Sequence, residues 1–216
     1  MKPGCPKKAF FLLWSWISLL VILSALQPPE QVYAQTASQE YYLSPEKELE
    51  LLKKILIFER SWKFKAENQL VVGILYQKSF SLSQWAMEDW VKLTTELPES
   101  DRQIGGLPIV IKEIDLDSVQ PLESALKELQ VHFLFLTPLD TKKNPQLLKN
   151  IIHLCDQQKI GTLTGTLDYL DSGVAIGFIW KDKKAQITIN LEAAKSQGLN
   201  FSSQFLRLIT LRKSND

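Results

Sequence analysis

The sequence predicts an α/β domain, a three-layer sandwich in which helices cover both faces of a mostly parallel central sheet. Apolar runs of strand length recur along the chain, at residues 70–76, 107–114, 131–136 and 160–166. Amphipathic stretches of helical periodicity separate them, and this alternation is typical of right-handed β-α-β crossovers. The pattern then changes to a β-hairpin and closing helices at the C-terminus.

The first two helices are predicted from apolar spacing. Residues 46–62 repeat Leu51, Ile55, Phe58 and Trp62 at helical intervals, which makes one face of the helix apolar. A second helix begins near Ser81, a residue suited to a cap. Its apolar stripe is Leu82, Ala86, Trp90, Leu93 and Leu97, with Trp85 and Met87 off the stripe. Trp85 is therefore a candidate interface residue, and packing in the core or at the helix edge is the favoured alternative.

The later elements follow from turn and cap signals. A Gly105-Gly106 turn precedes the run 107–114, and short helices are predicted from Asp117 or Ser118 to Leu129 and from Pro145 to Gln157. Runs at 174–180 and 185–190 have the spacing of a hairpin. Asn190 can cap a helix that ends at Gly198, and a last helix is expected from Ser202 or Ser203 to Arg212.

The N-terminus has the pattern of a secretory signal peptide. Lys2, Lys7 and Lys8 precede an apolar run over residues 9–26, and small residues at 32 and 34 favour cleavage between Ala34 and Gln35. The alternative is an uncleaved membrane anchor, because 18 helical residues span roughly 27 Å. We expect a signal over residues 1–34, a flexible linker over 35–45 and one domain over 46–213, located outside the cytoplasm.

Charge and cysteine content restrict the function further. Lys and Arg total 25 against 24 Asp and Glu, and no long run of one sign occurs, so nucleic-acid binding is not expected. Cys5 lies within the signal, so Cys155 would remain alone and could form no internal disulfide. A lone thiol in an oxidising compartment is either buried or able to link two chains.

No catalytic, metal-binding or cofactor-binding motif is evident. His132, His153 and Cys155 are the remaining His and Cys residues, and their spacing does not suit a shared metal ion. The stretch GTLTGT at 161–166 lacks the lysine of a phosphate-binding loop. We therefore expect no metal, no cofactor and no enzyme activity.

One group of polar residues is a candidate ligand pocket. Thr137 and Asp140 follow the third predicted strand, and Thr166, Asp168 and Asp171 follow the fourth. The carboxyl ends of parallel strands meet at one sheet edge, where α/β proteins bind ligands. The same residue types serve as helix caps and turn formers, so a structural role remains an alternative.

The C-terminal third resembles the YfiR-like family of bacterial periplasmic proteins. Residues 174–208 contain its hairpin, an I-N-L-x-A-A-x-x-x-G-L segment and an S-S-x-x-L-x-L helix. These motifs correspond to Ile189-Asn190-Leu191, Ala193-Ala194, Gly198-Leu199, Ser202-Ser203, Leu206 and Leu208. Looser similarity at 51–62, 71–75, 104–114 and 132–137 extends the resemblance over residues 48–210.

The resemblance implies a regulator that does not catalyse a reaction. A protein of this type binds the periplasmic part of an inner-membrane sensor or diguanylate cyclase and represses it, which lowers cyclic di-GMP. The single Cys155 departs from the cysteine pairs of the family's type protein, so redox control by an internal disulfide is not expected. A periplasmic solute-binding module is the alternative function, and a homodimer is also left open.

Overall fold

The computed structural model describes residues 43–119, 121–181 and 184–212. The predicted signal at 1–34, the cleavage residues Ala34 and Gln35, and most of the predicted linker lie outside the described residues. Among the residues that are described, no helix is long and apolar enough to cross a membrane.

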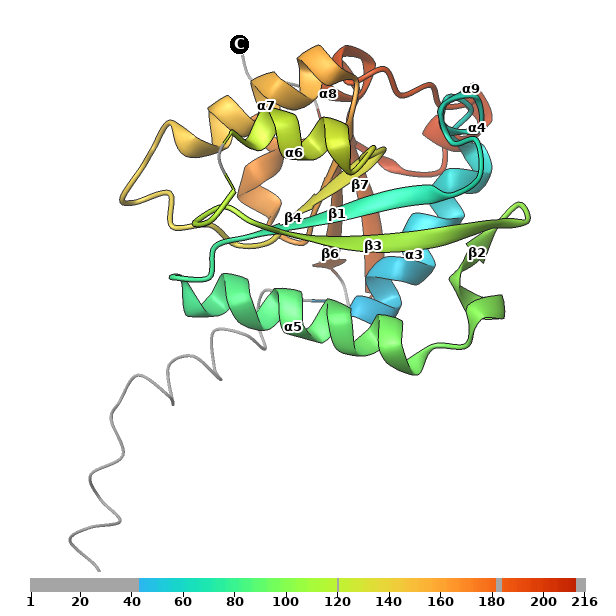
Figure 1. Cartoon of the computed structure of the whole chain (residues 1–216). Helices are drawn as coiled ribbons and strands as arrows, with labels where there is room; N and C mark the ends of the chain where they lie inside the picture. The colour runs from blue at the N-terminus through green and yellow to red at the C-terminus, as the bar shows by residue number, and fades with distance from the viewer. Residues whose placement is uncertain (1–42, 120, 182–183, 213–216) are drawn as a thin grey trace, which may run out of the picture. The chain divides into compact units, whose positions relative to one another are not determined.

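The described chain forms a mixed sheet of eight strands in the order β2-β3-β1-β4-β5-β6-β7-β8 (Figure 1). The pairs formed by β3, β1, β4, β5 and β6 are parallel, as is the β7–β8 pair, whereas β2–β3 and β6–β7 are antiparallel. The bounds are β1 Leu70–Tyr76, β2 Gln103–Ile104, β3 Leu107–Asp115, β4 Phe133–Leu136, β5 Gly161–Thr164, β6 Ile176–Lys181, β7 Lys184–Asn190 and β8 Thr210–Arg212.

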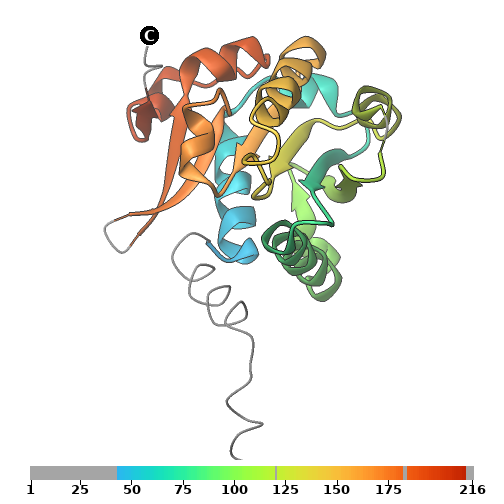
Figure 2. The same ribbon diagram turned by 90° about the vertical axis from the view of Figure 1, so that its left-hand side faces the viewer.

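Helices cover both faces of this sheet, which confirms the predicted α/β sandwich (Figures 1 and 2). Helices α3 and α5 pack on one face, and α6 and α7 pack on the other. The α-helices are α3 Pro45–Phe58, α4 Trp62–Lys65, α5 Ser81–Glu96, α6 Leu122–Glu128, α7 Leu147–Gln158, α8 Leu191–Ser196 and α9 Ser203–Leu206. Two 3-10 turns, η1 Glu99–Arg102 and η2 Leu167–Leu170, lie in the connections.

The two faces of the sheet support separate apolar cores. Strand β1 is buried along its whole length, and its residues alternate between the two cores. Leu70, Val72 and Ile74 pack with α3 and α5, whereas Val71 and Leu75 pack with α6 and α7. This explains why the strand is apolar at every position: a central strand of a parallel sheet has no solvent-facing side.

The first predicted helix is confirmed from residue 46 to Phe58 and is wrong only in its last turn. The chain leaves helical geometry at Glu59, whose backbone is extended, and a separate short helix, α4, begins at Trp62. Glu59 forms an isolated antiparallel bridge with Phe201. A contact with a residue more than 140 positions away therefore overrides a helical periodicity that continues through Trp62.

The last predicted helix begins at Ser203 as expected but is wrong in its length. Helix α9 ends at Leu206, and Thr210–Arg212 form strand β8 in parallel pairing with Thr188–Asn190. Backbone pairing with an open strand edge stabilises the extended form, and this cannot be seen in the local sequence. The hairpin and the Asn190 cap, by contrast, are as predicted, since the Asn190 side chain accepts a hydrogen bond from the Ala193 N–H.

Two smaller corrections concern helices in the middle of the chain. Helix α6 begins at Leu122 and not at residue 117 or 118, because the backbone carbonyl of Asp115 accepts hydrogen bonds from Ser118 and Val119 in a turn. In α5 the buried face includes Met87, which the sequence places off the stripe, while Trp85 is 41% exposed.

Candidate functional site

Of the residues proposed as a ligand pocket, Thr137 is fully buried and serves the fold. Its Oγ1 donates to the Leu75 carbonyl (2.9 Å) and lies 2.6 Å from Ser83 Oγ. Ser83 Oγ also accepts from the Gln77 N–H (2.8 Å). Because a hydroxyl has one proton to donate, Ser83 donates to Thr137, and the chain of bonds joins β1, β4 and α5.

Asp140 and Asp171 are held by ion pairs. Asp140 lies 2.9 Å from Lys143 Nζ, and this hydrogen-bonded lysine lowers the pKa of the Asp140 carboxyl. The Asp140 N–H donates to Gln77 Oε1 (2.6 Å). Asp171 is exposed and pairs with Arg212 of β8. These contacts fasten the loops at the strand ends.

Thr166 and Asp168 lie at the start of η2. The Thr166 N–H donates to Thr164 Oγ1 (3.0 Å). The Asp168 side chain is exposed and makes no hydrogen bond or ion pair with any residue that the structure describes. One hydrogen bond in the described chain joins two of the five proposed pocket residues, from the Asp171 N–H to the Asp168 carbonyl (3.3 Å) at the end of η2. No described side chain among the five bonds to another of them, and none of the five lines the cavities discussed below.

The two histidines take part in local hydrogen bonding. His132 Nδ1 accepts from the Val71 N–H (3.1 Å), and its Nε2 lies 3.2 Å from the Lys65 carbonyl oxygen. His153 Nε2 lies 3.0 Å from Gln157 Nε2 on the same helix. No group of three or more His, Cys, Asp or Glu side chains in the described ranges could hold a metal ion.

The thiol of Cys155 is a core group. It is fully buried and unpaired among the described residues. Burial, assisted by the negative charge of Asp156, raises its pKa to about 12. A thiol with so high a pKa is a poor nucleophile, so Cys155 suits neither catalysis nor a link between two folded chains.

A groove beside α3 is a better candidate for binding. It has a volume of about 390 Å³, and we call it the α3 groove. Its apolar lining comes from α3, the residue after α5, and β2: Leu49, Ile57, Leu97 and Ile104. Ile57 is 62% exposed, so a large apolar side chain stands at the solvent boundary of an apolar hollow. Such surfaces mark sites of protein or ligand binding.

Charged side chains of both signs border the α3 groove. They are Glu46, Glu50, Lys53, Lys54 and Asp101. Lys47 and Lys54 lie 2.8 Å and 2.6 Å from the Glu50 carboxylate and lower its pKa to about 2. Lys53 Nζ donates to the Asp101 carbonyl (2.9 Å) and so joins α3 to η1. An apolar floor with a mixed-charge border is the composition of a protein-binding surface.

Other exposed apolar side chains lie outside the lining of the α3 groove. Phe58 of α3 stacks on Phe205 of α9, with ring centroids 4.8 Å apart. A second hollow of about 440 Å³ includes Leu51 and the exposed Leu208. Trp180 of β6 is 62% exposed, whereas Trp62 and Trp90 are buried. The sequence singled out Trp85 as an interface candidate, and it did not single out these residues.

Two buried carboxylates were also missed. Glu48 is 2% exposed, and one of its oxygens accepts from Trp90 Nε1 (3.0 Å). Burial raises the pKa of Glu48 well above its ordinary value of 4.5. A sequence signal for this residue did exist, since Glu48 lies three and four positions before Leu51 and Leu52 on the apolar face of the helix.

Glu59 is the second buried carboxylate, at 1% exposed. Its oxygens accept hydrogen bonds from the backbone N–H groups of Ser61 (2.9 Å), Trp62 (2.9 Å) and Asn200 (2.7 Å). It therefore begins α4 and holds the segment before α9 against the end of α3. No local pattern indicates the contact with Asn200.

A family model described as YfiR/HmsC-like (DUF4154) matches residues 62–209. No curated protein matches the chain.

Three solved structures share the fold. A ligand-free, open substrate binding protein with adhesive properties from Clostridium difficile has a TM-score of 0.52 and 15% identity, covering 81% of this chain and 61% of its own. A conserved domain protein from Vibrio cholerae has a TM-score of 0.52 and 15% identity, and the match covers 79% of this chain and 60% of that protein. An ABC domain in complex with L-Trp from Streptococcus pneumonia has a TM-score of 0.51 and 12% identity, and the match covers 78% of this chain and 60% of that domain. The chain spans about three fifths of each, and the likeness shows the α/β fold.

Proposed function

The chain belongs to the YfiR/HmsC-like family, and on that premise we propose that it binds and represses an inner-membrane signalling protein such as a diguanylate cyclase. Family membership supports a regulator of the periplasm, and the match over residues 62–209 is the observation that carries the proposal. We propose that residues 1–34 are a secretory signal peptide, which is cleaved between Ala34 and Gln35 during export. The linker at 35–45 then precedes a single domain at 46–213, and N-terminal sequencing of the exported protein checks the cut.

Repression by binding works through a population shift. A regulator that docks on the inactive conformation of a sensor domain shifts the receptor only as far as its affinities for the two conformations differ. A hundredfold repression needs at least a hundredfold preference, which is about 2.8 kcal/mol. This mechanism requires a specific docking surface and no catalytic group.

The α3 groove is the docking surface that we propose for the receptor. An apolar side chain of the receptor would fill the hollow against Ile57, Leu97 and Ile104 and displace water from it. The carboxylates and lysines at its border would orient the receptor, because complementary charges set specificity and association rate. The lysine-paired Glu50 stays ionised throughout the physiological pH range.

Replacing Ile57 by Glu is expected to weaken receptor binding at least tenfold, because a charge is placed where apolar surface must lose its water. The fold should persist, since the Ile57 side chain is 62% exposed. The measurement is cyclic di-GMP in cells that lack the gene and carry wild type, Ile57→Glu or the control Leu167→Glu. Leu167 is 41% exposed and lies on η2, outside the α3 groove.

Deletion should raise cyclic di-GMP, and wild type and the control should restore the low level while Ile57→Glu does not. Equal amounts of exported protein are verified by immunoblot. If deletion leaves the cyclic di-GMP level unchanged under several growth conditions, the proposed repression of a cyclase is contradicted. If Ile57→Glu represses as fully as wild type, the α3 groove is ruled out as the docking surface, whereas the proposed repression of a cyclase is unaffected.

A solute-binding module is the second candidate. It is favoured by Asp168, an exposed carboxylate near the strand ends that makes no hydrogen bond or ion pair within the described chain. The similar fold of proteins whose titles name substrate binding or L-Trp makes free amino acids a sensible set of probes. A ligand at a hundred times its Kd stabilises the protein by about 2.7 kcal/mol, which thermal denaturation detects.

Asp168→Ala is expected to abolish any such thermal shift. Thr137 and Asp140 are engaged in internal contacts, so their substitution would change stability even without ligand. A shift of equal size in wild type and Asp168→Ala would place the solute elsewhere on the protein. The absence of any shift across the amino-acid set leaves the regulator as the better function.

A further inference from the structure

Strand β3 presents an open edge. Strand β2 pairs with it only at Leu107 and Pro108, and β1 pairs with Ile109–Asp115 on the other side. No other described strand pairs with residues 109–115. In Figure 1 this strand crosses the front of the view with no described helix or strand before it. An unpaired strand edge is a template for a further strand.

The hydrogen-bonding groups of this edge alternate in direction. The Leu116 N–H donates to the Tyr76 carbonyl of β1, so even-numbered residues of β3 direct their backbone groups towards β1. The odd-numbered residues Ile109, Ile111 and Glu113 therefore direct N–H and C=O outwards. Backbone groups at an edge of this kind bind an added strand without distortion of the existing sheet.

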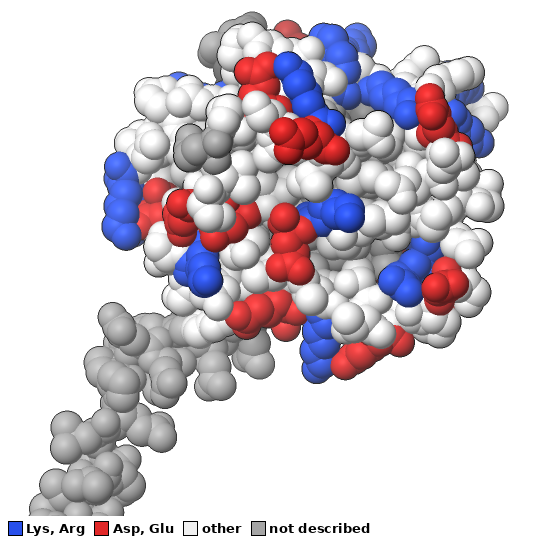
Figure 3. Space-filling model, viewed as in Figure 1, with Lys and Arg blue, Asp and Glu red and all other residues white. Residues whose placement is uncertain are grey.

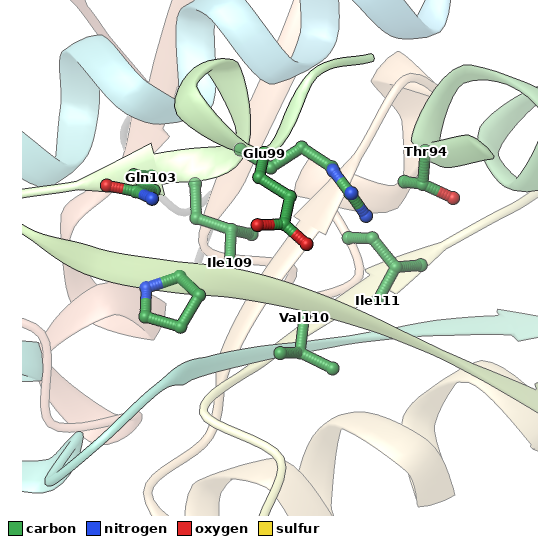
Figure 4. Close-up of a pocket in the computed structure, with 8 residues that line it drawn as sticks. Thr94, Glu99, Gln103, Ile109, Val110 and Ile111 are labelled. Carbon is green, nitrogen blue, oxygen red and sulfur yellow. The ribbon is translucent and has the colours of Figure 1, made fainter. Parts of the chain in front are cut away.

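A cavity of about 350 Å³ lies along the first part of this edge. Ile109 and Ile111 lie on the side of β3 that faces Glu99, and Val110 lies on the opposite side (Figure 4). Arg102 also lines the cavity, and its Nε is buried without a hydrogen-bond partner among the described residues. A buried donor without an acceptor is unfavourable, so an occupant that supplies an oxygen here gains affinity.

A second copy of the chain does not suit this edge. Two copies could pair through β3 as antiparallel strands related by a two-fold axis. If the axis passed through Ile111, Ile114 of the second copy would lie opposite Pro108, a position that Gln103 of β2 already occupies. An axis through Lys112 or Glu113 places like charges directly opposite each other, and an axis through Ile114 places Glu113 opposite Asp115. The face shown in Figure 3 carries charges of both signs with uncharged surface between them, which suits a short mixed-charge segment.

We propose that the open edge of β3 binds an extended segment of a partner protein as an added antiparallel strand. The segment carries a basic residue opposite Glu113, an acidic residue opposite Lys112, and apolar residues opposite Ile111 and Ile109. One of its oxygens accepts from Arg102 Nε. The antiparallel direction follows from its slightly greater stability per residue. The surface is separate from the α3 groove, and the inference does not depend on the identity of the receptor.

Two capped synthetic peptides test the register. The peptide KEITI places lysine opposite Glu113 and glutamate opposite Lys112 in the antiparallel register, and EKITI has the same composition with those charges exchanged. Fluorescence anisotropy with labelled peptides and purified protein should show KEITI binding at least tenfold more tightly than EKITI. The double variant Lys112→Glu with Glu113→Lys should reverse this preference. Equal affinities for the two peptides would overturn the proposed register.

A proline variant tests the backbone contact. Glu113→Pro removes an outward N–H while the pairing of β3 with β1 uses other residues, so KEITI should lose at least tenfold in affinity. Glu113→Ala keeps the N–H and should lose only the charge contribution. Unfolding midpoints of both variants show whether the fold is kept. Peptide binding unchanged by Glu113→Pro would overturn strand addition.

Analytical ultracentrifugation of the unliganded protein completes the test. A dimer of wild type that Glu113→Pro abolishes would assign the edge to a second copy and overturn the partner segment as occupant. A monomer that binds KEITI supports the proposal. Because the assay contains no cyclase, its failure and the failure of the proposed function are separate results.

Discussion

Replacing Glu59 by Ala is expected to destabilise the protein by about 3–5 kcal/mol. The carboxylate accepts three backbone N–H groups, from Ser61, Trp62 and Asn200, and it is 1% exposed. Each buried donor left without an acceptor costs about 1–3 kcal/mol, and water entering the gap recovers part of that sum. The loss is large against a total stability of about 5–15 kcal/mol.

Urea unfolding followed by circular dichroism measures this effect. Glu67→Ala is the matched control, because Glu67 is exposed nearby in the chain, and its loss should be within about 0.5 kcal/mol. Glu59→Gln should fall between the two: its amide oxygen can still accept from two N–H groups, but its NH₂ would face the third donor. Equal stability of Glu59→Ala and the control would show that the three bonds contribute nothing net.

The stability of the protein is expected to fall as the pH rises above 4.5, through the buried carboxyl of Glu48. Its pKa is raised well above 4.5 by burial, and the hydrogen bond from Trp90 opposes this only in part. A folded state that holds the proton more tightly than the unfolded chain is favoured fully below pH 4.5. That advantage is lost as the pH rises towards the folded pKa, with a slope of up to about 1.4 kcal/mol per pH unit for one proton.

Unfolding free energies of wild type and Glu48→Gln between pH 4 and pH 9 measure this linkage. Gln cannot ionise and still offers an oxygen to Trp90 Nε1, so the stability difference between the two proteins should change steadily in favour of Gln as pH rises. Glu88→Gln, an exposed substitution on α5, should keep the wild-type profile. Parallel profiles for wild type and Glu48→Gln would mean that Glu48 binds protons equally in both states.

The fold class was predictable because its signals are local. Strand β1 is apolar at every position since it is buried on both faces, and the sequence shows this directly. The turn at Gly105 and Gly106 is visible in the same way, because both residues adopt positive φ. The Asn190 cap and the family motif around it lie within a few residues of each other, so they also could be found without a structure.

The candidate sites were less predictable. The proposed pocket residue Thr137 was placed at the correct sheet edge, but its hydroxyl is directed into the core towards Ser83 and Leu75. The α3 groove combines residues from α3, the residue after α5, η1 and β2, and no single segment contains its pattern. The open edge of β3 likewise depends on β2 being only two residues long.

The sequence by itself determined the alternation of helix and strand, the parallel order implied by it, and the family. Periodicity, turn residues and caps act over a few residues, so a linear sequence contains their information. Only the tertiary structure decided where α3 ends, that residues 210–212 become β8, and which carboxylates are buried. Glu59 meets Asn200, and Thr188 meets Thr210, because the folded chain brings distant backbone groups together, and hydrogen bonding between them outweighs local helical preference.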